Sequence, residues 1–365
     1  MSTPLAFSGL LTTIAIALVP IYLIYKWVQP PSYLKDVPGL SVMTVLKGLF
    51  SKEGFSLTLR NNLQPILEEH KIAKVYFGAM WVVFLSDPED CKKICSQTEV
   101  FPKFQIFNNN KNHFLFKFFG VNVVGANGEE WKNHRKVTNP AFRRPWPTKL
   151  FAESVYNLFD AIDKHIGQTQ DAHDLMQRMT LDVLGQGLFE YDFKALKNHD
   201  SQRLKLYNAL MKGIFDPILS FFPILAKLPL LRIKKLKAHM EEFNTLLYSI
   251  LEDKKREYQE KLANDTFNER SADLLTLMIK ATYEDQHLTD DELRSNLLVF
   301  FIAGHDTTAN SLSSILCYLA LYPKYQEKAR EEARSILGDD PRVYPTFEQQ
   351  AKELPFINAI IKEAM

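Results

Sequence analysis

The sequence predicts a mainly α-helical fold with a small β-subdomain, preceded by one transmembrane helix. Three observations carry this prediction. After Thr148, apolar residues recur at three- and four-residue spacing, which is typical of amphipathic helices. One short stretch before it has the composition of a β-hairpin, and an uncharged apolar run lies close to the N-terminus.

The N-terminal run, Leu5–Tyr25, has about twenty residues without a charge, which is near the length that crosses a bilayer. Its first basic residue, Lys26, comes after the run, whereas a cleaved signal peptide has a basic start and a shorter apolar core. We therefore expect residues 1–28 to be a signal anchor with a lumenal N-terminus, and a cleaved signal is the alternative. Prolines in residues 29–45 predict a stiff linker, and residues 46–365 remain for one domain.

The β-subdomain is predicted from two short apolar runs, Val75–Phe77 and Trp81–Leu85, separated by Gly78-Ala79-Met80. Asp87-Pro88 then ends the hairpin and opens a short helix that carries Cys91 and Cys95. The aromatic and asparagine-rich segment Phe101–Gly125 has no clean period, so we expect a long functional loop there.

Helices are predicted over a series of segments with helical apolar spacing: 151–166, 174–189, 201–215, 233–262, 273–281 and 288–321. The stretch 218–231 is too short and too interrupted by proline to span a membrane. Lys227, Arg232, Lys234 and Lys235 flank it, as in interfacial segments that contact anionic lipid. A buried loop is the alternative.

The most informative helix is Leu288–Leu321. Thr289 and Glu292 fit a capping box at its start, and Pro323 stops it. At its centre Ala303 and Gly304 lack bulk, so a flat cofactor or substrate could approach the backbone there. Next to them, Asp306 would supply protons and the hydroxyls of Thr307 and Thr308 would relay them. The alternative is that the small residues only allow another helix to cross, with the polar residues facing solvent.

This motif resembles the oxygen-activation helix of the haem-thiolate monooxygenases, the cytochromes P450. A second match is Trp131 and Arg135, which resemble the Trp-x-x-x-Arg helix of that family and lie four residues apart, on one helical face. The resemblance implies that these two side chains hold a haem propionate. An arginine fork suits a carboxylate, and an indole N–H is a donor only.

A third match is Leu354–Met365, which resembles the start of the Glu-x-x-Arg helix, with Glu363 as its structural acid. The arginine and the cysteine that binds iron would fall beyond Met365, and no haem-loop pattern surrounds Cys91, Cys95 or Cys317. We therefore expect a partial domain over 46–365 that is cut short before its axial ligand and has no metal ligand of its own.

The resemblance further implies a membrane protein of the endoplasmic reticulum with its catalytic part in the cytosol. Such a protein inserts one atom of dioxygen into a lipophilic substrate, using haem and electrons from NADPH through a reductase. Two alternatives stay open: a catalytically inactive anchored fragment, and a haem-thiolate isomerase or dehydratase, although Asp306-Thr307 speaks against the latter.

The composition of the chain limits the classes of partner that it is expected to bind. The net charge of +1 offers no global argument for nucleic acid, so none is expected. Three cysteines do not make a disulfide framework. The basic residues Lys132, Arg135, Lys136, Arg143 and Arg144 could receive an acidic electron donor, or form a solvated surface.

Overall fold

The structure is a computed structural model that describes residues 22, 25–26, 28–52, 54–77, 80–104, 114–143, 148–198, 201–216, 218–219, 223–269, 272–285 and 288–365. The predicted anchor, Leu5–Tyr25, lies almost entirely outside these ranges, as does Phe107 of the predicted loop. No helix within the described ranges combines the length and the apolar character that crossing a bilayer needs.

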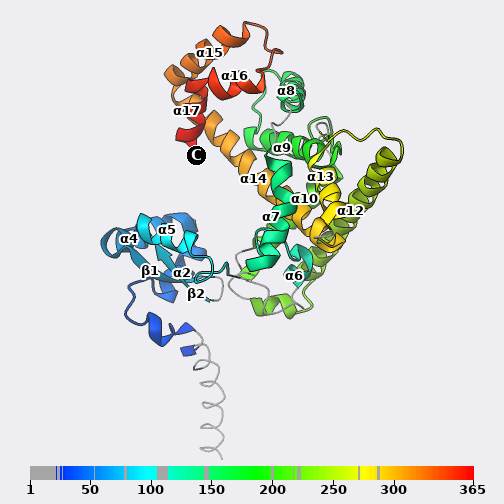
Figure 1. The fold of residues 1–365 in the computed structure, drawn as a ribbon. Helices are drawn as coiled ribbons and strands as arrows, with labels where there is room; N and C mark the ends of the chain where they lie inside the picture. Colours follow the sequence, from blue (N-terminus) through cyan, green and yellow to red (C-terminus); the bar gives the residue numbers. More distant parts are fainter. Residues whose placement is uncertain are drawn as a thin grey trace, which may run out of the picture. The chain divides into compact units, whose positions relative to one another are not determined.

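The chain divides into two compact units. Unit 1 comprises Met1–Pro102 and Phe215–Ile233, and unit 2 comprises Lys103–Ile214 and Lys234–Met365. The two strands in the described part of the chain belong to unit 1, and helices dominate unit 2, as the sequence predicts (Figure 1).

Unit 1 is built around a two-stranded antiparallel sheet whose register places Val75 opposite Val82. Helices pack on it through a small core that includes Val45, Leu63 and Ala73. Its described elements are η1 Ser32–Leu34, α2 Val42–Leu49, α3 Phe55–Asn62, α4 Gln64–His70, β1 Ile72–Phe77, β2 Met80–Leu85, α5 Pro88–Ser96 and η3 Pro223–Lys227.

The hairpin and the helix after it confirm the predictions for this unit. The Asp87 side chain caps α5 by accepting from the backbone N–H groups of Glu89 and Asp90, and Pro88 occupies the first turn, where no N–H is needed. In the segment after η3, Leu228, Leu230 and Leu231 are 45%, 44% and 69% exposed, so these leucines do not form a buried loop.

Unit 2 holds the remaining described helices. They are α6 Phe114–Phe119, α7 Gly128–Phe142, α8 Thr148–Asp163, α9 Ala172–Phe189, α10 Gln202–Ile214, α12 Leu231–Ala263 (from Lys234), α13 Leu274–Asp285, α14 Asp290–Leu321, α15 Pro323–Leu337, α16 Phe347–Lys352 and α17 Pro355–Ala364. The predicted loop Phe101–Gly125 is wrong in part, because its run of apolar aromatic residues forms the one-and-a-half turns of α6.

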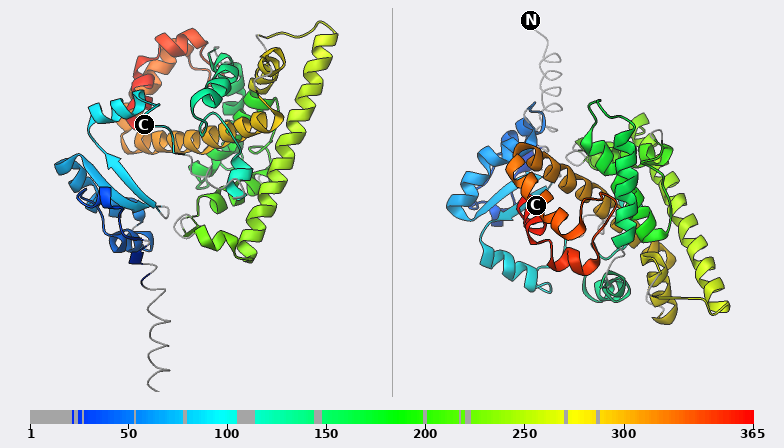
Figure 2. Two further views of the ribbon diagram at one scale, coloured as in Figure 1. Left: turned by 60° about the horizontal axis from the view of Figure 1, so that its bottom comes forward. Right: turned by 90° about the horizontal axis from the view of Figure 1, so that it is seen from above.

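The predicted central helix is confirmed as α14, which makes its main packing contact with α9. The capping box is present: the Thr289 side chain accepts from the N–H of Glu292, and the Glu292 carboxylate accepts from the N–H of Thr289 over 2.7 Å. α15, α16 and α17 gather at the C-terminal end of α14 (Figures 1 and 2). The Glu332 carboxylate on α15 accepts from the first N–H groups of α17, at Phe356 and Ile357, over 2.9 Å each.

Candidate functional site

The centre of α14 has one buried and one open face. Phe301, His305 and Ala309 are almost fully buried, whereas Ala303, Thr307 and Thr308 are exposed. Because residues at these spacings share a helix face, the buried set packs inside unit 2 and Ala303 and Thr307 line the open side. A small residue on the open face leaves the backbone of α14 accessible at Ala303.

Gly304 faces a different neighbour. A Cβ atom at Gly304 would come within 2.8 Å of Leu184 Cδ2 on α9. This glycine therefore allows α14 and α9 to approach closely, which is the alternative that the sequence left open for the small residues. Its contribution to the site is to set the position of Ala303, its neighbour.

A cavity of about 370 Å³ opens beside Ala303. Its walls come from the segment that contains Phe104, α6, the turn that follows α6, the first turn of α7, and α14. They are mostly apolar, with Glu130 as the charged residue, and comprise Phe104, Phe116, Phe119, Gly120, Val121, Asn122, Val124, Gly125, Ala126, Glu130, Val299, Ile302 and Ala303. The composition suits a lipophilic ligand with few polar groups.

The turn at 120–126 is fixed by its own polar groups. Asn122 Oδ1 accepts from the N–H groups of Val124 and Gly125, and its Nδ2 donates to the carbonyls of Phe119 and Gly120. Gly120 has φ +58°, and a Cβ there would meet Ser295 Oγ at 2.1 Å. Only glycine allows the turn to press this closely on α14.

Trp131 and Arg135 lie on one face of α7, as predicted, with the Arg135 guanidinium 5.9 Å from the centre of the indole ring. Sequence reasoning missed a third member, Lys103, whose ammonium lies 5.3 Å from the same ring and donates to the Val123 carbonyl over 3.1 Å. Asn127 holds its backbone through two 2.9 Å hydrogen bonds. Lys103 lies far from Trp131 in the sequence and belongs to no recognisable motif, so the sequence alone does not indicate its role.

Lys103 and Arg135 lie close enough for their positive charges to repel each other. Burial, followed by the nearby Arg135 charge, lowers the pKa of Lys103. Within the described residues, no carboxylate forms an ion pair with Lys103 or Arg135. Two cations near one indole, with no carboxylate ion-paired to either among the described residues, make a binding position for an anion such as a carboxylate.

Asp306 does not pair with Thr307. Its carboxylate accepts from Gln177 Nε2 on α9 over 3.4 Å and from the Tyr207 hydroxyl on α10 over 3.3 Å. The Thr307 hydroxyl donates to the Ala303 carbonyl on the open face, and Thr308 is exposed. The predicted acid and hydroxyl are thus neighbours in sequence that point to different sides of α14.

His305 lies behind Asp306 and is fully buried. The Thr180 hydroxyl is 2.9 Å from His305 Nδ1, and the Tyr207 ring packs edge-on against the imidazole at 4.6 Å. Because Thr180 also lies within donor distance of the Met176 carbonyl, its oxygen is free to accept from Nδ1–H. Burial, partly offset by Asp306, lowers the pKa of His305 to about 4, so the ring is neutral at pH 7.

Of the predicted site residues that the structure describes, Ala303 alone is among those that line the cavity. Glu363 is exposed on α17. Cys91 and Cys95 are on α5 of unit 1, and Cys317 is exposed near the end of α14. The described residues include no cluster of three or more acidic, histidine or cysteine side chains that could hold a metal ion.

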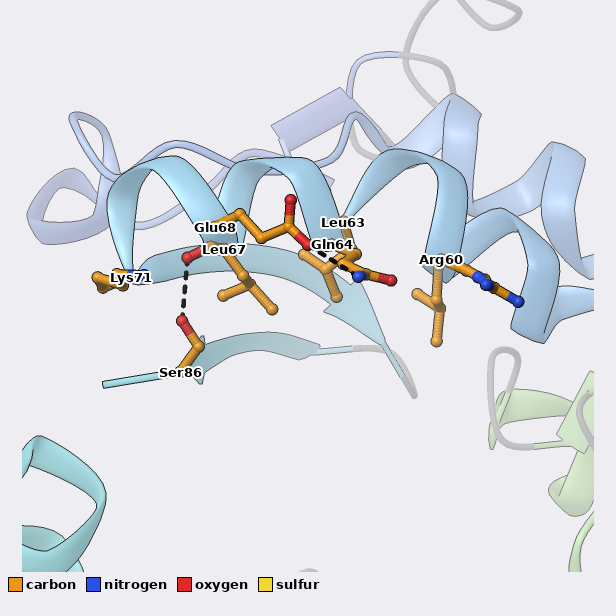
Figure 3. A pocket seen from close by; sticks show the side chains of 8 residues that line it. Arg60, Leu63, Gln64, Leu67, Glu68, Lys71 and Ser86 are labelled. Atoms are coloured by element: carbon orange, nitrogen blue, oxygen red, sulfur yellow. Dashed lines mark hydrogen bonds between the residues drawn. The ribbon is translucent and has the colours of Figure 1, made fainter. Parts of the chain in front are cut away.

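Unit 1 has a separate depression of about 460 Å³ along α3, α4 and the end of β2 (Figure 3). Its polar groups already bond one another: Gln64 Nε2 donates to Glu68 over 2.8 Å, and the Ser86 hydroxyl donates to the Leu67 carbonyl over 3.0 Å. None of the residues predicted for the site lines it, so we assign it no role.

A haem fits part of this arrangement. Lys103, Trp131 and Arg135 supply donors of the kind that propionates require, and Ala303 leaves room beside the cavity for a flat ring. The described cysteines do not border the cavity, so the axial ligand is not assigned to any of them.

Comparisons with known proteins identify the family of the chain. The family model for cytochrome P450 matches residues 45–365. Cytochrome P450 monooxygenase 128 of Postia placenta is 30% identical over 78% of this chain and 55% of its own length. Human cytochrome P450 4Z1 is 26% identical over 81% of this chain and 60% of its own length. The chain thus spans a little over half the length of these relatives.

Two further matches extend over more of the chain. Cytochrome P450-DIT2 of Saccharomyces cerevisiae is 25% identical over 94% of this chain and 68% of its own length. The crystal structure of the cytochrome P450DA haem domain superposes with a TM-score of 0.68 and 19% identity, over 90% of this chain and 69% of that one. This likeness concerns the fold.

Proposed function

Because the chain belongs to the cytochrome P450 family, we propose that it serves a haem-dependent monooxygenase that inserts one atom of dioxygen into a lipophilic substrate. NADPH would supply the electrons through a reductase. The observation that supports the proposal is that Ala303 and Glu130, the residue before Trp131, border the same cavity, so the two sequence matches would belong to one site. Haem, when bound, supplies the oxygen chemistry.

The chain's own residues have separate roles in this proposal. Arg135, Trp131 and Lys103 would bind the propionates, Ala303 would lie against the ring, and the apolar walls would hold the substrate and exclude water. Asp306 would exchange protons with the cavity through the hydroxyls of Thr307 and Thr308, after leaving its partners Gln177 and Tyr207. Glu363 would have a structural role.

The same proposal includes a membrane location. Residues 1–28 would anchor the chain in the endoplasmic reticulum with its catalytic part in the cytosol, because an uncharged run is followed by Lys26. The exposed Leu228, Leu230 and Leu231, close to Lys227 and Arg232, would touch the lipid surface.

The test is spectroscopic and uses the full chain isolated with its membranes and supplemented with a NADPH-dependent reductase. From the chain joined to the haem-loop segment of a family member, which supplies the thiolate that Cys91, Cys95 and Cys317 are not assigned to provide, we expect the red-shifted carbon monoxide band of a thiolate-bound haem and substrate-dependent dioxygen uptake coupled to NADPH oxidation. Absence of that band would support the inactive fragment instead. Conversion of a substrate with the band but without dioxygen uptake would support an isomerase or dehydratase.

A further inference from the structure

One buried amide joins two walls of the cavity. The Asn296 side chain on α14 is fully buried. Its Nδ2 lies 2.7 Å from His134 Nδ1 on α7, and its Oδ1 accepts from the Val123 N–H over 2.8 Å. Val121, Val124 and Ala126, which flank the Val123 bond, line the cavity. His134 stands one residue before Arg135. The same amide therefore contacts both the 120–126 turn, which lines the cavity, and α7, the helix that carries Trp131 and Arg135.

The directions of both hydrogen bonds follow from the chemistry of the groups. A backbone N–H is a donor only, so the amide oxygen must face Val123 and the amide NH₂ must face His134. His134 Nδ1 therefore accepts, and the proton of a neutral ring lies on Nε2. That Nε2 atom is buried and has no hydrogen-bond partner within the described part of the chain.

We propose that Asn296 and His134 form a proton-sensitive clamp that holds the 120–126 turn against α7 only while His134 is neutral. A protonated imidazole carries hydrogen on both ring nitrogens, so Nδ1–H would face the amide NH₂, donor against donor. The Asn296 side-chain amide can avoid this donor–donor repulsion by rotating so that its oxygen faces His134. The Val123 N–H then loses its acceptor, and a wall of the cavity is released.

The charged groups around His134 influence the pH at which its ring becomes protonated. Glu292 Oε1, on α14, lies 3.8 Å from Nε2 and favours the protonated ring. Lys103, which also holds the turn through the Val123 carbonyl, opposes protonation. Burial is the largest influence, and the pKa of His134 is lowered from its ordinary value. The clamp is therefore closed at pH 7 and opens in acid.

The 120–126 turn lines the cavity that is proposed to hold substrate and haem. The functional significance of the clamp therefore rests on the proposed function. Its experiment reads the hydrogen bonds themselves and needs no haem. A failed clamp would leave the monooxygenase proposal standing, and failure of that proposal would leave the clamp measurable.

The test combines two measurements on the full chain between pH 7.5 and 5. Hydrogen exchange followed by mass spectrometry on a peptide spanning 120–127 reports the Val123 amide, with rates corrected for their intrinsic pH dependence. Carbon NMR of the imidazoles reports protonation of His134. In the wild type we expect protection of this peptide to fall about tenfold as His134 titrates, the effect of losing one buried hydrogen bond. Peptides from α9 should stay protected over the same range.

Two substitutions make the proposal falsifiable. Asn296→Asp supplies two acceptors, so Val123 keeps its bond, the protonated His134 gains one, and both protection and proton affinity should rise in acid. Asn296→Ala should expose the peptide at every pH. His165→Gln, an exposed change after α8, is the control. The clamp is overturned if wild-type protection at 120–127 does not respond to His134, or if Asn296→Asp leaves the His134 titration where it was.

Discussion

Tyr207 donates a hydrogen bond to the Asp306 carboxylate over 3.3 Å, so the acid of the α14 motif is held from α10. Gln177 on α9 donates to its other oxygen over 3.4 Å. Burial and the neighbouring Asp306 raise the pKa of Tyr207, which therefore remains a donor throughout the accessible pH range. Asp306 thus has two neutral partners, and the proposed proton delivery to the cavity would require it to leave both.

Replacing Tyr207 by phenylalanine should release Asp306 from α10. Because the bond is long and Asp306 is partly exposed, we expect the free energy of unfolding to fall by about 1 kcal/mol, below the usual value for a bond to a charged group. Urea unfolding measures this. Tyr325→Phe on the surface of α15 is the matched control, expected within about 0.5 kcal/mol of wild type. Equal effects of the two changes would argue against the Tyr207–Asp306 bond.

His305 should make the protein sensitive to acid. Its pKa is lowered to about 4 by burial, whereas an exposed histidine titrates near 6.5. The unfolded chain therefore binds a proton first, and stability present above about pH 6.5 is lost as pH falls toward 4, by about 3 kcal/mol in total.

His305→Gln removes this titration, so its unfolding free energy should depend less on pH between 7.5 and 5 than that of the wild type. The exposed His165→Gln serves as the control and should keep the wild-type slope. Denaturant midpoints at several pH values give the slopes, and parallel curves for His305→Gln and wild type would contradict the assignment.

Gly304 and Ala303 are adjacent but should respond differently to the same substitution. Gly304→Val adds a branched side chain where Leu184 already lies within 2.8 Å of the first added atom, so we expect a loss of about 1–3 kcal/mol. Ala303→Val enters the open cavity and should cost only the helix propensity, below about 0.7 kcal/mol. Trimming Leu184 to alanine should rescue part of the Gly304→Val loss. A double-mutant cycle without coupling would show that the two residues do not meet.

Deleting residues 1–28 should change how the chain partitions. We expect the full chain to stay with membranes after an alkaline carbonate wash and the shortened chain to be released, because the uncharged run is lost. Lys26→Ala keeps that run and should stay in the pellet. Pelleting of the shortened chain after the wash, to the same degree as the full chain, would contradict the anchor.

Most of the fold can be predicted from the spacing of apolar residues, because long amphipathic helices and a hairpin produce strong local patterns. The capping box at Thr289 and the start of α5 at Asp87-Pro88 are local in sequence and are predicted correctly. α6 was missed, since an aromatic run without polar spacing has no period to detect.

The site was predictable only where residues share a helix. Trp131 and Arg135 are four apart, and the α14 motif is contiguous. Lys103 and Tyr207 reach the site from distant positions, and Asn296 on α14 bonds to the distant Val123 and His134, all through tertiary packing. The opposite directions of Asp306 and Thr307 also depend on α9 and α10, which no local pattern describes.

The central claim is that Ala303 and the cationic group at Lys103, Trp131 and Arg135 are two sides of one haem site. Titration of the purified full chain with hemin, followed by quenching of tryptophan fluorescence, tests it most directly. We predict saturable binding of one hemin that weakens about tenfold or more in both Ala303→Phe and Arg135→Ala, while Lys136→Ala on the same helix binds like wild type. Equal hemin affinity in all four proteins would contradict the account.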